Sequence, residues 1–144
     1  MKNIFVAFDL EEKSKLLLSH AKQLAEKFGS KIWVVHIAAP NPDFVGFDIG
    51  PQYIRDTRAD ELRAEHRYLQ EMAAGLEAEG IAAEALLIQG PTVEMILEEA
   101  QKLNADLIVA GLHDRGFLHK ALFGDTVKQL LKKSKTPLLI VPVD

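Results

Sequence analysis

The sequence predicts an α/β protein with an open parallel sheet and helices on both faces, and three observations lead to this fold class. Short apolar runs without polar alternation recur along the chain, as is typical of strands covered on both faces. Segments with apolar residues at helical spacing lie between these runs. The two kinds of segment alternate, so the strands are expected to be parallel and joined by right-handed crossovers.

Each expected strand is a short apolar run, and the five runs are 4–8, 32–37, 85–88, 107–110 and 138–141. Each expected helix has an apolar stripe at helical spacing. The first stripe precedes Gly29, a residue suited to ending a helix, and comprises Leu17, Ala21, Leu24, Ala25 and Phe28. The other three stripes are Leu62, Leu69, Met72 and Leu76, then Val93, Ile96, Leu97, Ala100 and Leu103, and finally Val127, Leu130 and Leu131.

Length, charge and composition exclude several classes of protein. The 144 residues suit one domain over 1–144. The absence of cysteine excludes disulfides, thiol nucleophiles, zinc–thiolate sites and iron–sulfur clusters. A net charge of −4 argues against nucleic acid or an anionic membrane as partner. No apolar run approaches the ~20 residues of a membrane helix, so we expect a cytoplasmic protein.

One segment does not fit the strand and helix pattern. Residues 39–53 hold three of the six prolines and two glycines, together with Phe44, Phe47 and Tyr53. Loops of this length in compact domains are usually mobile or functional. Two interpretations therefore stay open, a mobile flap with its aromatic side chains packed on the core, or a segment that contacts a ligand or partner.

Ligands of open parallel sheets bind beyond the carboxyl ends of the strands, where the strand order reverses. The residues at these ends are Asp9, Ile37 and Ala38, the segment 89–91, and the segment from Gly111 onward. The segment 111–126 holds three glycines and leads into a helix, as phosphate-binding loops do. Residues 111–135 carry six Lys or Arg and two acids, which favours a small anion as ligand or, alternatively, is only a solvated helix end.

Several stretches resemble the universal stress protein family, in its single-domain UspA-like form. They are IFVAFD at the first strand, KIWVVHIAAP at the second, IQGPTVEMILEEAQKLNADLIVAG from the third to the fourth, and TPLLIVPV at the last. The resemblance covers essentially the whole chain. It implies a Rossmann-like fold of the adenine nucleotide alpha hydrolase type, with strand order 3-2-1-4-5, and places the reversal of strand order between Asp9 and Gly111.

Nucleotide-binding members of that family carry Gly-x-x-Gly, nine residues, and then Gly-Ser or Gly-Thr. Gly111 and Gly124 match the first and last glycines, whereas Asp114 and Asp125 replace the middle glycine and the hydroxyl residue. A carboxylate beside phosphates is repulsive, by about 1 kcal/mol at 4 Å in water. Thr126 is placed to supply the hydroxyl instead, or Gly116 to take over part of the role of the middle glycine. Asp125 is also a suitable helix N-cap.

The resemblance therefore implies a pocket for ATP or AMP in altered form. AMP loses less binding free energy than ATP to repulsion by the two aspartates, because AMP carries less negative charge. By resemblance, Asp9 and Ile37 flank the adenosine end, and the phosphate end is formed by Gly111, His113, Gly124 and Thr126. A divalent cation, Mg²⁺ or Mn²⁺, is expected only together with the nucleotide, bridging an aspartate and phosphate oxygens.

No catalytic residue is assigned. No histidine or serine lies in a pattern typical of metalloproteases or nucleophile elbows, and His36 is expected to be a packed, hydrogen-bonded side chain. We therefore expect a non-enzymatic regulatory module. The alternatives are a metal-dependent ATP- or AMP-binding switch with at most slow hydrolysis, and an interaction module with an empty pocket.

The last strand suggests a second copy of the chain as partner. In the family that this chain resembles, the last strand often pairs with its twin across a two-fold axis. The apolar strand within 137–143 would need such a cover at a sheet edge. We therefore expect a homodimer through residues 137–143, although Pro142 removes one hydrogen-bond donor.

Overall fold

The structure, a computed structural model, describes residues 1–39, 52–113 and 126–143. The predicted loop 39–53 and the glycine-bearing segment 111–126 therefore fall largely outside the described residues. The expected roles of Asp114, Gly124 and Asp125 fall there too.

All five predicted strands and all four predicted helices are present. The strands are β1 (Asn3–Ala7), β2 (Lys31–Ala38), β3 (Ala83–Gln89), β4 (Leu107–Leu112) and β5 (Leu138–Pro142). The helices are α1 (Lys15–Phe28), preceded by a 3₁₀ turn over Glu12–Ser14, then α2 (Gln52–Ala78), α3 (Thr92–Lys102) and a last helix over 126–133. Helix α2 thus begins inside the span that the sequence predicts as loop.

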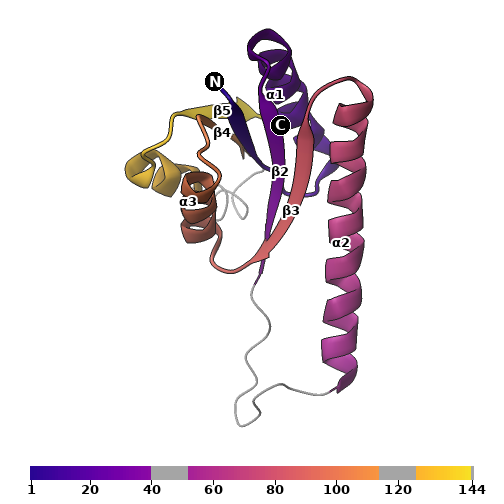
Figure 1. The fold of residues 1–144 in the computed structure, drawn as a ribbon. Coiled ribbons are helices and arrows are strands. Elements are labelled where there is room, and N and C mark those ends of the chain that lie inside the picture. Colours follow the sequence, from indigo (N-terminus) through magenta and orange to yellow (C-terminus); the bar gives the residue numbers. More distant parts are fainter. Residues whose placement is uncertain (40–51, 114–125, 144) are drawn as a thin grey trace.

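The sheet is parallel throughout and has the order β3-β2-β1-β4-β5, as the sequence predicts (Figure 1). The central strand is β1, in which Val6 lies opposite Val34 of β2 and Val109 of β4. The order in which successive strands are added to the sheet reverses between β1 and β4. The carboxyl ends of these two strands therefore flank the position where ligands of open sheets bind.

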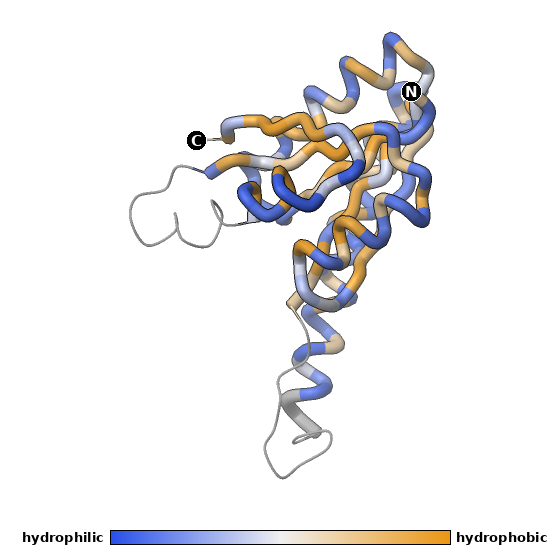
Figure 2. Tube along the Cα trace, turned by 90° about the vertical axis from the view of Figure 1, so that its left-hand side faces the viewer, coloured by the Kyte–Doolittle hydropathy of each residue, from blue (hydrophilic) through white to orange (hydrophobic). Residues whose placement is uncertain are grey.

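Two apolar cores cover the two faces of this sheet. Alternate residues of β1 point to opposite faces, so Val6 packs in the core under α1 and α2, whereas Phe5 packs under α3 and the helix 126–133. Figure 2 shows the apolar segments concentrated along the strands and the hydrophilic ones along outer helix surfaces. Burial of each large side chain contributes roughly 1.5–3 kcal/mol, which is why uninterrupted apolar runs become central strands.

Helix α1 follows the predicted stripe except at its last residue. Leu17, Ala21 and Ala25 are buried, but Phe28 is 58% exposed, so the prediction that Phe28 faces the core is wrong. The chain turns at Gly29, whose φ of 68° is left-handed and whose N–H donates to the carbonyl of Ala25. Phe28 therefore lies at the end of the helix, past the packed part of the stripe.

Helix α2 is the longest element, and it extends well past the sheet (Figure 1). Its second half packs on the sheet through Leu69, Ala73 and Leu76, which are buried. Within the described part of the chain, no helix is both long enough and apolar enough to cross a membrane.

Candidate functional site

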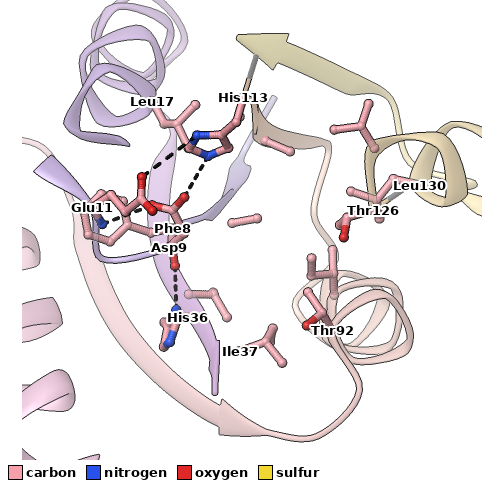
Figure 3. Close-up of a pocket in the computed structure, with 16 residues that line it drawn as sticks. Phe8, Asp9, Glu11, Leu17, His36, Ile37, Thr92, His113, Thr126 and Leu130 are labelled. Atoms are coloured by element: carbon pink, nitrogen blue, oxygen red, sulfur yellow. Dashed lines mark hydrogen bonds and ion pairs between the residues drawn. The ribbon is translucent and has the colours of Figure 1, made fainter. Parts of the chain in front are cut away.

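A cavity of about 420 Å³ opens at the carboxyl ends of β1, β2 and β4 (Figure 3). Its apolar wall comes from strand residues and from the two helices on one face of the sheet, and includes Ala7, Val35, Ile37, Ile96, Ala110 and Leu130. Polar side chains stand on two sides of it, with Asp9, Glu11 and His113 on one side and Thr92 and Thr126 on the other. The volume lies within the range of small-molecule sites.

The structure brings most of the predicted site residues together. Asp9, Ile37, Gly111, His113 and Thr126 all line this cavity. Gly124 falls outside the described residues. The agreement follows from the parallel sheet, which collects the carboxyl ends of all its strands at one edge.

Asp9 is held in place by the turn that follows β1. Its Oδ1 accepts hydrogen bonds from the backbone N–H of Glu11, at 3.1 Å, and from the hydroxyl of Ser14. Leu10, between them, adopts a left-handed φ of 70°, which bends the chain back toward Asp9. One carboxylate oxygen is thus used for local structure, and Oδ2 is left for a partner across the site.

That partner is His113, which follows β4. Its Nε2 lies 2.9 Å from Asp9 Oδ2, and its Nδ1 lies 3.9 Å from Glu11 Oε2 (Figure 3). The imidazole is only 3% exposed. The resemblance assigns Asp9 to the adenosine end and His113 to the phosphate end of a nucleotide, whereas in the structure these two side chains are hydrogen-bonded to each other.

The order of hydrogen bonds is not that of a nucleophilic triad. In such triads the histidine lies between the nucleophile and the carboxylate, so that it takes the proton of the nucleophile. Here Asp9 lies between Ser14 and His113. The arrangement therefore orients the imidazole but does not activate the Ser14 hydroxyl.

His36, at the end of β2, is hydrogen-bonded as expected and also lines the cavity. Its Nδ1 donates to the carbonyl of Phe8, at 2.9 Å, because a carbonyl oxygen only accepts. Its Nε2 lies 4.0 Å from Glu65 Oε2, on α2. This side chain connects β2 with the chain after β1 and lies beside α2.

The sequence-based prediction leaves out several residues at or beside the site, among them Glu11, Ser14 and Thr92. Glu11 and Ser14 complete the surroundings of Asp9, and no sequence motif distinguishes them from other polar residues near a strand end. Thr92 opens α3 directly after the segment 89–91, so its position at a strand end is the signal that would have found it. Gly90 shapes that connection with a φ of 149°, a conformation that favours glycine.

The glycine at position 111 is not required by packing of the described residues. A Cβ there would meet Val143 at 3.4 Å and Leu17 at 3.7 Å, which are ordinary or nearly ordinary contacts. Its φ also lies outside the left-handed range. Any need for glycine at position 111 must therefore arise from something other than these neighbours.

Comparison with known proteins is consistent with this architecture. Residues 1–142 match the universal stress protein family. A universal stress protein of Thermus aquaticus, encoded in the QAH/OAS sulfhydrylase 3′ region, is 32% identical, covering 97% of this chain and 98% of its own.

Among solved structures, universal stress protein UspA from Lactobacillus plantarum is similar with a TM-score of 0.81 at 13% identity, over 97% of each chain. A universal stress protein solved in complex with cAMP has a TM-score of 0.73 at 21% identity, covering 99% of this chain and 98% of its own. These two structures share the fold, and the family match over residues 1–142 shows the common family. The chain belongs to the universal stress protein family.

Proposed function

We propose that this chain is a non-enzymatic, cytoplasmic module of the stress response, folded as one domain over 1–144, whose state is set by an adenine nucleotide. The observation that carries the proposal is the cavity of about 420 Å³ at the carboxyl ends of β1 and β4, lined by five of the six residues that the sequence assigns to the nucleotide. It combines an apolar wall with polar groups on two sides, as ligand sites do.

The cavity suggests how the nucleotide lies. The apolar residues Val35, Ile37 and Ala110 offer a surface for the flat adenine base, and Asp9 is a hydrogen-bond acceptor at its edge. The phosphate end lies toward Gly111 and Thr126. His113 acts in this arrangement by holding Asp9, to which it is hydrogen-bonded.

A monophosphate suits the site better than a triphosphate. Asp9 and Glu11 already place two carboxylates on the cavity, and Asp114 and Asp125 add two more in the segment expected at the phosphates. Each further phosphate charge raises the repulsion. A related protein of this fold was solved with cAMP, which is also a monophosphate.

Among the described residues, the Ser14 hydroxyl beside Asp9 is not arranged as an activated nucleophile, which supports a binding module over an enzyme. It donates to Asp9 rather than to a histidine. The competing candidate is a metal-dependent switch that binds ATP and hydrolyses it slowly. It is favoured by the carboxylates and the imidazole that line one side of the cavity.

We also propose that the module is a homodimer through residues 137–143. β5 is the last strand of the sheet, and an apolar edge strand is stabilised by pairing with a second copy. Sedimentation equilibrium at micromolar concentration should give twice the mass of the 16.0 kDa chain. A mass of one chain at that concentration would exclude the dimer.

Thermal unfolding of the nucleotide-stripped protein tests the proposal that it binds an adenine nucleotide. We expect AMP to raise the melting temperature in the presence of EDTA, and ATP to do so less. A ligand at 100 times its dissociation constant adds about 2.7 kcal/mol to the free energy of unfolding, which is several degrees for a domain of this size. An effect of ATP that requires Mn²⁺ or Mg²⁺ would favour the switch instead.

A matched pair of variants locates the binding site. Ile37→Trp places a large ring at the cavity wall and should abolish the shift with AMP. Leu112→Trp is the control, because Leu112 is also a partly exposed apolar residue at a strand end but does not line the cavity. No shift in the parent protein with any nucleotide, or equal shifts in both variants, would overturn the proposal.

A further inference from the structure

We propose that Asp9, Glu11 and His113 form a binding site for a transition-metal dication, Zn²⁺ or Mn²⁺, which needs no nucleotide. One ligand atom from each of the three side chains lies within 4.8 Å of the other two. Asp9 and Glu11 follow β1 and His113 follows β4, so two segments 104 residues apart supply the side chains of the site. The sequence alone predicts a cation only as a companion of the nucleotide.

The hydrogen bonds around Asp9 determine which nitrogen of His113 faces a metal. Oδ1 of Asp9 accepts from Ser14 and from the N–H of Glu11, which holds the carboxylate in one orientation. Oδ2 lies 2.9 Å from His113 Nε2. An ionised carboxylate only accepts, so Nε2 donates and carries the proton. In the neutral imidazole the lone pair is then on Nδ1.

Nδ1 faces the carboxylate of Glu11 across a gap of metal-ligand size. The distance from Nδ1 to Glu11 Oε2 is 3.9 Å, too long for a hydrogen bond. Zinc bonds of about 2.0–2.1 Å to nitrogen and 2.0–2.2 Å to oxygen add up to slightly more than this gap. The Glu11 side chain is 31% exposed, and a small rotation of its carboxylate would give a bent coordination angle.

The three residues form an arrangement common around protein metals, in which a carboxylate accepts the second N–H of a metal-binding imidazole. Such a carboxylate fixes the ring and makes the other nitrogen a stronger ligand. Asp9 has this role here, and Glu11 is the oxygen ligand. A dication also offsets the repulsion between two carboxylates beside a nearly buried imidazole.

The donor set indicates the class of metal. Imidazole with carboxylate suits zinc and manganese, whereas Mg²⁺ prefers oxygen ligands alone and retains its waters. The three residues line the cavity, and a metal held by His113 and Glu11 would have further coordination positions for water or for a ligand in it. The site therefore adjoins the proposed nucleotide without depending on it.

Isothermal titration of the chelator-treated, dialysed protein with ZnCl₂, MnCl₂ and MgCl₂, with no nucleotide present, tests this site. We expect one ion per chain, with Zn²⁺ bound more tightly than Mn²⁺ and Mg²⁺ weakest. Glu11→Gln should weaken Zn²⁺ binding at least tenfold, because it removes the charge of the oxygen ligand. Glu12→Gln is the matched control, since Glu12 is the next residue but pairs with Lys15 outside the cluster.

Thermal unfolding without metal should show that Glu11→Gln folds like the parent, since this side chain is partly exposed. The proposal is overturned if neither Zn²⁺ nor Mn²⁺ binds, or if Glu11→Gln binds Zn²⁺ as tightly as Glu12→Gln does. The nucleotide proposal is judged separately, from the melting shift with AMP in EDTA, so either can fail without the other.

Discussion

Two aspartates link β1 with β4 at opposite ends of these strands, and the two have different roles. At the amino end, Oδ2 of Asp106 accepts the backbone N–H groups of Lys2 and Asn3, at 2.7 and 3.0 Å. At the carboxyl end, Asp9 binds the side chains of Ser14 and His113. The contacts of Asp106 and the contact between Asp9 and His113 join the β1 region to the β4 region at the centre of the sheet.

The difference lies in what each carboxylate holds and how exposed its surroundings are. Asp106 is exposed and binds only backbone groups, so it aligns the start of β1 beside β4. Asp9 lies in a cavity and binds groups that are themselves chemically versatile, a hydroxyl and an imidazole. The same residue type is thus a structural link at one edge of the sheet and part of the candidate site at the other.

Replacement of Asp9 should have the largest effect. Asp9→Ala removes the acceptor of a buried hydroxyl and of a nearly buried imidazole, Ser14 and His113. Loss of the partner of a buried polar group costs about 1–3 kcal/mol, measurable by urea unfolding. The variant should also lose both Zn²⁺ binding and the melting shift with AMP. A variant as stable as the parent, or one that keeps both ligands, would contradict this role of Asp9.

Replacement of Asp106 should have a smaller effect and leave ligand binding intact. Hydrogen bonds from the backbone N–H groups of Asn3 and Lys2 lower the pKa of the Asp106 carboxyl. A carboxyl group whose pKa is lowered in the folded state stabilises the folded state at a pH above the pKa of the unfolded state, ~3.9. This stabilisation is lost as the pH falls through the lower pKa of the folded state. The difference in the free energy of unfolding between the parent and Asp106→Ala should therefore be largest at neutral pH and disappear below about pH 4.

Urea unfolding of both proteins over a pH series measures that gap. AMP and Zn²⁺ binding by Asp106→Ala should equal those of the parent at neutral pH, because Asp106 does not line the cavity. A gap that widens in acid, or a loss of ligand binding, would show that the two ends of the sheet are not separable in function.

Most of the fold was predictable because it depends on local patterns. The apolar runs of β1 and β4 are uninterrupted, and such runs become buried strands whatever their partners. The stripe of α1 is equally local, and it predicts Leu17, Ala21 and Ala25 correctly. It fails at Phe28 because periodicity carries no information on where the neighbouring sheet ends.

The candidate site was predictable only in part. Asp9 and Gly111 are found from the sequence because strand ends of a parallel sheet converge at one edge. The participation of Glu11 and Ser14 cannot be found from the sequence, because it depends on the left-handed turn at Leu10. The division into adenosine and phosphate ends also gives no hint that Asp9 and His113 are hydrogen-bonded.

Three features follow from the sequence alone: which segments are strands and helices, their order, and the edge of the sheet at which a ligand should lie. Hydrophobic periodicity encodes these features locally, and the crossover rule for parallel strands converts them into a fold. Which polar side chains contact one another depends on the three-dimensional fold. Asp9 and His113 are 104 residues apart, and a contact at 2.9 Å depends on strand register and side-chain direction, which no local pattern specifies.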